Sequence, residues 1–211
     1  MGGARMERIT VYGPQRFDLR PDREQAFAWL SCVESLPCYD IFARNWPDAA
    51  ALSADLAEPR VAFCREAPDA LTVFLTLGPA AERRIDALFA RQEYVLASLL
   101  NTVCDQLLFQ LDRHAAALLG GEAARGGLHI AARLEPGVEY PVSRQRRLFE
   151  PLQPALPFAR ISETGVLYPA KSMMYCVKLS AQAGGAESLH DCARCSPTDC
   201  PYRTEKQRIP R

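Results

Sequence analysis

The sequence predicts an α+β domain with a mixed or antiparallel sheet flanked by helices, one of which is long. Apolar residues recur at helical spacing over roughly seven turns between Glu93 and Leu119, a stripe that only a helix packed on a sheet would bury. Segments rich in β-branched and aromatic residues occur on both sides of this helix. Their order is irregular and not strictly βαβα, which favours an α+β arrangement.

The first half of the chain predicts two helices, two strands and a third helix. A helix over residues 21–36 starts behind Pro21 and two early acids, and a shorter one over 47–56 ends before Pro59. Two strands follow at 60–64 and 70–78. The short turn-prone link between them indicates that these strands are neighbours, and Pro79 suits the first turn of the helix that follows up to residue 92.

The second half begins with the long helix, which we expect Gly120 and Gly121 to end. After it we predict a strand over 128–135, a Pro-Gly turn, and a helix over 142–152 whose basic run faces solvent. Two strand-like segments follow, at 158–162 and 172–180. The chain is expected to divide into a flexible N-terminus, an α+β domain and a cysteine-rich tail, with bounds 1–16, 17–182 and 183–211.

Charge and composition exclude several classes of function. Lys and Arg together number 25, as do Asp and Glu, so no global positive field attracts nucleic acid or anionic lipid. No window approaches the roughly 18 consecutive apolar residues that span a bilayer, and we expect a cytoplasmic protein. The sequence contains neither a dinucleotide-binding glycine motif nor a phosphate loop, and it has no Ser/His/Asp order typical of a hydrolase.

Three of the eight cysteines crowd together near the C-terminus. Cys192, Cys195 and Cys200 follow a C-x2-C-x4-C spacing, with His190 two residues before the first of them. Such a turn lets two thiolates face one ion, and the third cysteine completes a trigonal face. In a reducing compartment a disulfide framework is not expected. We predict a metal site, against the alternative of thiols with no metal.

A fourth ligand is required, and Cys176, His190 and Cys38 are its candidates. Zinc and an iron-sulfur cluster both fit these ligands, because softness and geometry separate the two and sequence does not. Three further cysteines lie on apolar faces of predicted elements, where cysteine behaves as a small hydrophobic residue; these are Cys32, Cys64 and Cys104.

Asp112 and His114 partly match D-x-H-x-x-G, a cobalamin-ligating loop pattern, but residue 117 is Ala. The match also falls inside the long predicted helix and not in a loop after a strand. We therefore interpret His114 as a solvated helix residue near the helix C-terminus, where positive charge is favourable.

Arg133 is the strongest candidate for a ligand contact. It closes a predicted strand four residues before Gly137, so its guanidinium can lie beside a turn whose backbone a ligand approaches closely. This arrangement suits a carboxylate. An arginine before a Pro-Gly turn is more often a plain surface residue, so this signal is weak when taken alone.

Two stretches carry a resemblance to a known family. Arg133, Pro136 and Gly137 form the first part of its pattern, and the second part lies in ISETGVLYPAKS, at Ser162, Glu163, Pro169, Lys171 and Ser172. The chain resembles the activation domain of cobalamin-dependent methionine synthase, and more closely its short stand-alone relatives. The resemblance covers roughly residues 17–180, and the cysteine tail resembles the ending of some stand-alone members.

The resemblance implies that the chain binds S-adenosylmethionine and docks over cobalamin carried by another protein. In that family, one electron and the methyl group of S-adenosylmethionine restore methylcobalamin from the Co(II) state. Arg133 would bind the ligand's carboxylate, Gly137 would allow close approach, and Glu163 would meet the ammonium group. Lys178 completes the cofactor-binding candidates.

The implied partner is a corrinoid protein or a truncated methionine synthase, because no cobalamin-binding module is recognised in the sequence. The implied role is that of an accessory or activation subunit of methionine synthase or a related corrinoid methyltransferase. An iron-sulfur cluster in the tail would supply the electron that this activation needs.

Three positions depart from the family pattern and support an alternative. Val138 stands where a tyrosine follows the glycine, while Val177 and Lys178 stand where the full-length enzyme has an aromatic pair near the ligand. The alternative is a non-catalytic interaction or electron-transfer module with a zinc or iron-sulfur tail.

Overall fold

The computed structural model describes residues 9–182, 200 and 202. Its main sheet has five strands in the order β1-β2-β3-β7-β4, and every neighbouring pair is antiparallel. The strands are β1 (Thr10–Tyr12), β2 (Arg60–Ala67), β3 (Ala70–Thr76), β4 (His129–Leu134) and β7 (Ser172–Ser180). The short strands β5 (Arg160–Ile161) and β6 (Leu167–Tyr168) pair separately. The predicted α+β fold is confirmed, with an antiparallel sheet; β1 and β6 are not among the predicted elements.

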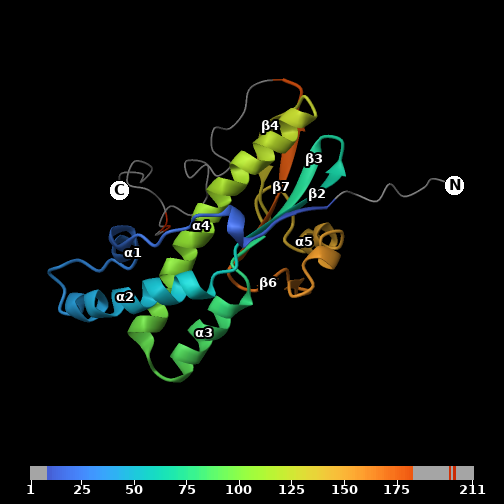
Figure 1. Ribbon diagram of the computed structural model, residues 1–211. Helices are drawn as coiled ribbons and strands as arrows, with labels where there is room; N and C mark the ends of the chain where they lie inside the picture. Colours follow the sequence, from blue (N-terminus) through green and yellow to red (C-terminus); the bar gives the residue numbers. More distant parts are fainter. Residues whose placement is uncertain (1–8, 183–199, 201, 203–211) are drawn as a thin grey trace.

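Helices cover both faces of this sheet (Figure 1). The five α-helices of the described residues are α1 (Arg23–Trp29), α2 (Tyr39–Leu56), α3 (Pro79–Ala90), α4 (Tyr94–Arg125) and α5 (Arg144–Phe149). Two short 3-10 helices lie at Pro14–Arg16 and Gln153–Ala155. Helix α4 runs along one face of the sheet and α5 lies on the other. Within the described ranges, no helix combines the length and the apolar character that crossing a membrane requires.

The alternation of side chains along β7 builds two hydrophobic cores. Tyr175 and Val177 point toward α4, where they join the large core that contains Leu107 and Leu111. Met174 and Cys176 point the opposite way, into a smaller core with residues of α5. Any residue of the sheet can therefore be placed on the α4 face or the α5 face from its register.

Helix α4 is longer than predicted, because it continues through Gly120 and Gly121 to Arg125. Leu119 and Ala123 on either side of the glycines are fully buried, and this packing outweighs the low helix propensity of glycine. The helix ends where Gly127 takes a φ of +66° and the Leu128 N–H donates to the carbonyl of Ala123.

The first predicted helix is also corrected. It begins at Arg23, where the Asp22 side chain caps it by accepting from Gln25, and it ends at Trp29 and not at Leu36. Ser31 takes a φ of +53°, and the Cys32 N–H turns back to the carbonyl of Phe27. The next helix, α2, starts at residue 39, eight residues earlier than predicted, and accommodates a proline within it.

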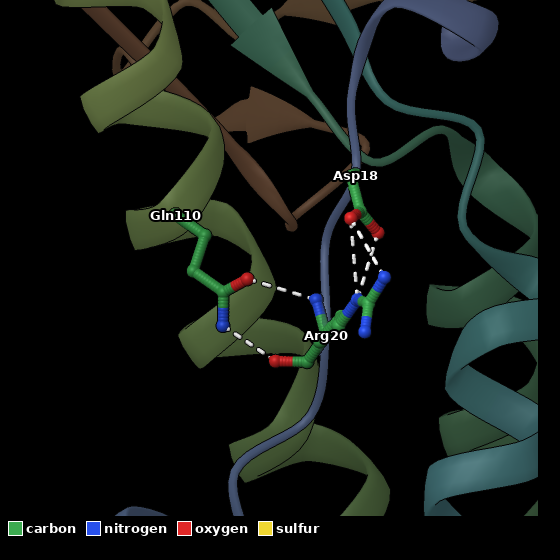
Figure 2. A network of polar contacts seen from close by, with 3 residues as sticks. All are labelled: Asp18, Arg20 and Gln110. Atoms are coloured by element: carbon green, nitrogen blue, oxygen red, sulfur yellow. Dashed lines mark hydrogen bonds and ion pairs between the residues drawn. The ribbon is translucent and has the colours of Figure 1, made fainter.

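Two glutamines of α4 hold the extended segment that precedes α1. The Gln110 side chain accepts from the Arg20 N–H at 2.9 Å and donates to the Arg20 carbonyl at 2.6 Å (Figure 2). Gln106 pairs in the same way with the backbone of Asp22, at 3.2 and 2.9 Å. Four residues along a helix rise about 6 Å, and two residues of an extended chain span roughly 6.6 Å. Glutamines four residues apart on α4 can therefore meet backbone groups two residues apart in the segment. The segment is thereby aligned along α4.

Candidate functional site

Arg133 lies on the edge strand β4 and points to the α4 face of the sheet. Its register partner is Val177, whose side chain belongs to the α4-side core. The guanidinium Nη1 lies 2.6 Å from Oδ2 of Asp112 on α4, and Nε lies 2.9 Å from Oε1 of Glu135. The Arg133 side chain is only 7% exposed, so its charge is balanced by carboxylates of the protein itself.

The ring of Tyr175 lies against this cation, with the ring centroid 3.7 Å from the guanidinium carbon of Arg133. Burial alone would lower the pKa of Arg133, but Asp112, Tyr175 and Glu135 together raise it above its usual value. Burial, and next the charge of Asp112, raises the pKa of the Tyr175 hydroxyl. One guanidinium and two carboxylates thus form a largely buried group, named here the Arg133 group, whose three side chains carry a formal charge of −1.

Glu135 connects the Arg133 group to the glycine turn. Its backbone N–H donates to Oε2 of Glu139 at 2.7 Å, and the Gly137 N–H donates to the carbonyl of Tyr140 at 2.7 Å. Gly137 has a φ of +80°, a conformation that L side chains rarely adopt. The Glu135 side chain is 34% exposed, which makes it the outermost charged member of the Arg133 group. Glu135 thus contacts Arg133 through its side chain and the glycine turn through its backbone, and a contact of the Arg133 guanidinium with Gly137 stays a prediction.

Glu163 lies in a second glycine turn. Its side chain is 92% exposed and its carboxylate is 4.0 Å from Arg146. Gly165 in the same turn has a φ of +86°, and a Cβ built on it would lie 2.2 Å from Cγ1 of Val142. Val142 also lies 3.5 Å from a Cβ built on Gly137, so the two glycine turns meet on this one side chain. Glu163 makes no recorded contact with the Arg133 group.

The two glycine turns carry exposed apolar side chains. Val138 is 66% exposed, Val166 is 51% exposed and Val142 is 38% exposed. We name these three residues the valine patch.

Lys178 lies on the other face of the sheet from Arg133. It is exposed on β7 and pairs in register with Ala132 and Ala70, whereas Arg133 pairs with the next residue, Val177. Successive strand residues point to opposite faces. Lys178 and the Arg133 group are consequently separated by the sheet.

Lys171 and Ser172, which belong to the second part of the family pattern, make contacts within the fold. The Lys171 ammonium pairs with Asp105 of α4 at 2.5 Å, and its carbonyl accepts from the Leu77 N–H. Ser172 donates to the Thr76 hydroxyl at 2.8 Å. These contacts join the start of β7 to the end of β3.

The predicted metal ligands Cys192 and Cys195, and His190, lie outside the described residues. Cys176 is described: it is 7% exposed, lies on the α5 face, and its sulfur is 3.8 Å from the hydroxyl of Thr72. Burial raises its pKa, which favours the thiol over the metal-binding thiolate. The described residues contain no group of three or more His, Cys, Asp or Glu side chains arranged to hold a metal ion.

The three cysteines that were predicted to lie in the core are buried. Cys32, Cys64 and Cys104 are 6%, 1% and 0% exposed, and they contribute to the hydrophobic cores. Burial raises the pKa of Cys104 to about 12. Cys38 is partly exposed at the start of α2. Burial is the main cause of the raised pKa of the Cys32 thiol, and the Cys38 thiol raises that pKa further.

Asp112 and Glu135, the two carboxylates of the Arg133 group, are not among the site residues predicted from the sequence. The Asp112 side chain is 8% exposed, and it lies inside the apolar stripe of α4 between Leu111 and Ala115. A lone carboxylate on a helix stripe that buries its neighbours is a signal for a buried ion pair. His114, in contrast, is exposed as predicted, but the helix continues 11 residues beyond it to residue 125.

An antiparallel sheet with one long helix across its face defines an α+β fold shared with a solved structure. The chain is similar to the MetH reactivation domain bound to AdoHcy, with a TM-score of 0.60, 10% sequence identity, and coverage of 86% of this chain and 81% of that chain. No protein-family model matches the sequence, and no curated protein matches it. The likeness shows the fold.

Proposed function

We propose that this chain binds S-adenosylmethionine and serves as an activation subunit of a cobalamin-dependent methionine synthase or a related corrinoid methyltransferase. The observation that carries the proposal is the shared fold with a domain crystallised with AdoHcy, together with the buried Arg133 group at the end of β4. AdoHcy is what remains of S-adenosylmethionine after its methyl group has left. When bound, S-adenosylmethionine supplies an electrophilic methyl group on a sulfonium.

The charge of the Arg133 group fits this ligand. S-adenosylmethionine carries a carboxylate, an ammonium and a sulfonium, so its net charge is positive, while the Arg133 group has one excess negative charge. Arg133 would bind the ligand's carboxylate as a planar fork, which requires Glu135 to turn outward. Glu135 is suited to this because it is the most exposed member of the group, whereas Asp112 stays beneath and holds the guanidinium in place.

The ammonium contact, expected from Glu163, is assigned in this proposal to Glu135. Glu135 lies next to the guanidinium that binds the carboxylate, and in an amino acid the two groups are attached to the same carbon. Gly137 keeps the turn clear of a side chain, so that the backbone can approach the ligand. Glu163 remains a predicted ligand contact, whereas Lys178, on the other face of the sheet, is not part of the ligand site proposed here.

The role of the protein residues in this proposal is positioning. Holding the methyl donor in line with an acceptor lowers the entropic part of the barrier, and no acid or base of the protein is needed. The valine patch is beside the turn that would hold the donor, so we propose that a corrinoid protein, or a truncated methionine synthase, docks there. A zinc ion or an iron-sulfur cluster in the cysteine tail remains part of the proposal, the cluster as the source of the electron.

Isothermal titration calorimetry with S-adenosylmethionine tests the proposal. The test variant is Arg133→Lys, which retains a cation but loses the planar fork, and the matched control is Arg146→Lys, whose side chain is 61% exposed. We expect the first to weaken binding by about tenfold or more, a cost of about 1.4 kcal/mol, and the second to leave it unchanged. The absence of binding heat from the parent protein, with its fold verified by circular dichroism, would refute the proposal.

One observation favours a second candidate, a non-catalytic interaction or electron-transfer module. The Arg133 charge is already balanced by two carboxylates of the same chain, so a purely structural role accounts for its burial. In that case the valine patch would serve a protein partner without a ligand. Binding of a corrinoid protein that is unaffected by S-adenosylmethionine, together with no heat in the titration, supports this module.

A further inference from the structure

Tyr202 is held by the domain through its ring and its hydroxyl. The ring centroid is 4.7 Å from that of Trp29 on α1, in an edge-to-face arrangement, and 5.3 Å from that of Phe109 on α4. Trp29 and Phe109 also contact each other, at 5.8 Å. Aromatic pairs of this geometry stabilise an interface beyond the area that they bury.

The Tyr202 hydroxyl donates to Oδ2 of Asp105 at 2.9 Å. The other oxygen of Asp105 pairs with the Lys171 ammonium, so one carboxylate binds both Tyr202 and the residue that precedes β7. Burial, and next the charge of Asp105, raises the pKa of Tyr202, which keeps the hydroxyl protonated as a donor. A ring between two aromatic side chains and a charge-assisted hydrogen bond are features of an anchor residue.

Gln106 and Gln110 of α4, which hold the segment before α1, are named here the clasp, and they help to build the site that receives Tyr202. Gln106 and Gln110 fix the backbone at Asp22 and Arg20, directly before α1, and α1 presents Trp29 to Phe109. Gln106, Phe109 and Gln110 lie within one turn or so of α4. The side chains that receive Tyr202 are therefore set by contacts that do not involve the C-terminal segment.

We infer that Trp29, Phe109 and Asp105 form a docking site for Tyr202 of the same chain, and that this anchor fixes residue 202 on α1 and α4. Asp105 and Asp112 are seven residues apart on α4, which corresponds to two turns and about 10 Å. The anchor thus sets Cys200 on the α4 side of the sheet, while Cys176 is on the α5 side. The anchor does not rest on the proposed function, because its contacts involve none of the residues of the Arg133 group.

Acrylamide quenching of tryptophan fluorescence tests the anchor in the full chain without any ligand. The chain has two tryptophans, and Trp29 is the one that Tyr202 covers. We expect Tyr202→Ala to raise the quenching constant of Trp29 about twofold, because the ring that covers the indole is lost. Tyr202→Phe keeps the ring and loses the hydrogen bond, so its effect should be intermediate.

Two further variants make the result decisive. Tyr94→Ala removes a 57% exposed tyrosine from the first turn of α4 and should leave quenching unchanged. In a Trp29→Phe background the effect of Tyr202→Ala should disappear, which assigns the signal to Trp29. Equal quenching of parent and Tyr202→Ala, or an equal increase in Tyr94→Ala, overturns the inference. Neither result depends on whether S-adenosylmethionine binds.

Discussion

Removing Asp112 is the perturbation whose consequence follows most directly from the structure. Arg133 and Asp112 are 7% and 8% exposed, and Asp112→Ala leaves the buried guanidinium with Glu135 as its remaining carboxylate. Breaking a buried pair by removing one partner costs about 3 to 5 kcal/mol. Because Glu135 remains in contact, we expect the lower end, about 3 kcal/mol.

Thermal unfolding followed by circular dichroism measures this cost. For a domain of this size each kcal/mol lowers the midpoint by about 2 to 4 °C, so Asp112→Ala should lower it by roughly 6 to 12 °C. The double variant Asp112→Leu with Arg133→Met replaces the pair by apolar groups and should recover most of the loss. Asp18→Ala, which breaks the exposed pair with Arg20, is the control and should leave the midpoint unchanged. A shift of under 2 °C for Asp112→Ala would refute the reasoning.

Further predictions concern the glycine turn, the clasp and the buried thiols. Gly165→Ala should destabilise the fold by about 2 to 3 kcal/mol, because its Cβ would overlap Val142 and its φ is positive; denaturant unfolding, compared with Gly120→Ala as an unstrained control, measures this. Gln106→Ala should cost about 1 to 3 kcal/mol and speed hydrogen exchange at the Asp22 amide, and an unchanged exchange rate would contradict the role of the clasp. Cys104, whose pKa burial raises to about 12, should resist thiol reagents at pH 8 until the protein unfolds; labelling of native protein, located by mass spectrometry, would show otherwise.

The elements with strong periodicity could be predicted from the sequence. The apolar stripe of α4 and the β-rich segments of β2, β3 and β7 depend on local patterns that tertiary contacts reinforce. The boundaries could not be predicted in the same way. Gly120 and Gly121 have the local signature of a helix end, yet the burial of Leu119 and Ala123 continues the helix. Packing that involves distant residues decides such positions.

The candidate site was predictable only in part, for a similar reason. Arg133 and Glu135 are close in sequence, at the end of a strand and the start of a turn, and their side chains pair. The other partner of Arg133 is 21 residues earlier on α4, and no local pattern joins the two. Lys178 is next to Val177, the register partner of Arg133, yet its side chain lies on the other face of the sheet. A shift of one residue along a strand decides which face a side chain occupies.

The ratio of the affinities for S-adenosylmethionine and AdoHcy tests the central claim most directly. The two ligands differ by a methyl group and one positive charge, and the Arg133 group has one excess negative charge. We predict that the parent protein binds S-adenosylmethionine about tenfold more tightly, that Glu135→Gln abolishes this preference, and that Glu150→Gln, at an exposed position, preserves it. Equal affinities in the parent protein, or a preference unchanged in Glu135→Gln, would contradict the assignment of the Arg133 group as the ligand site.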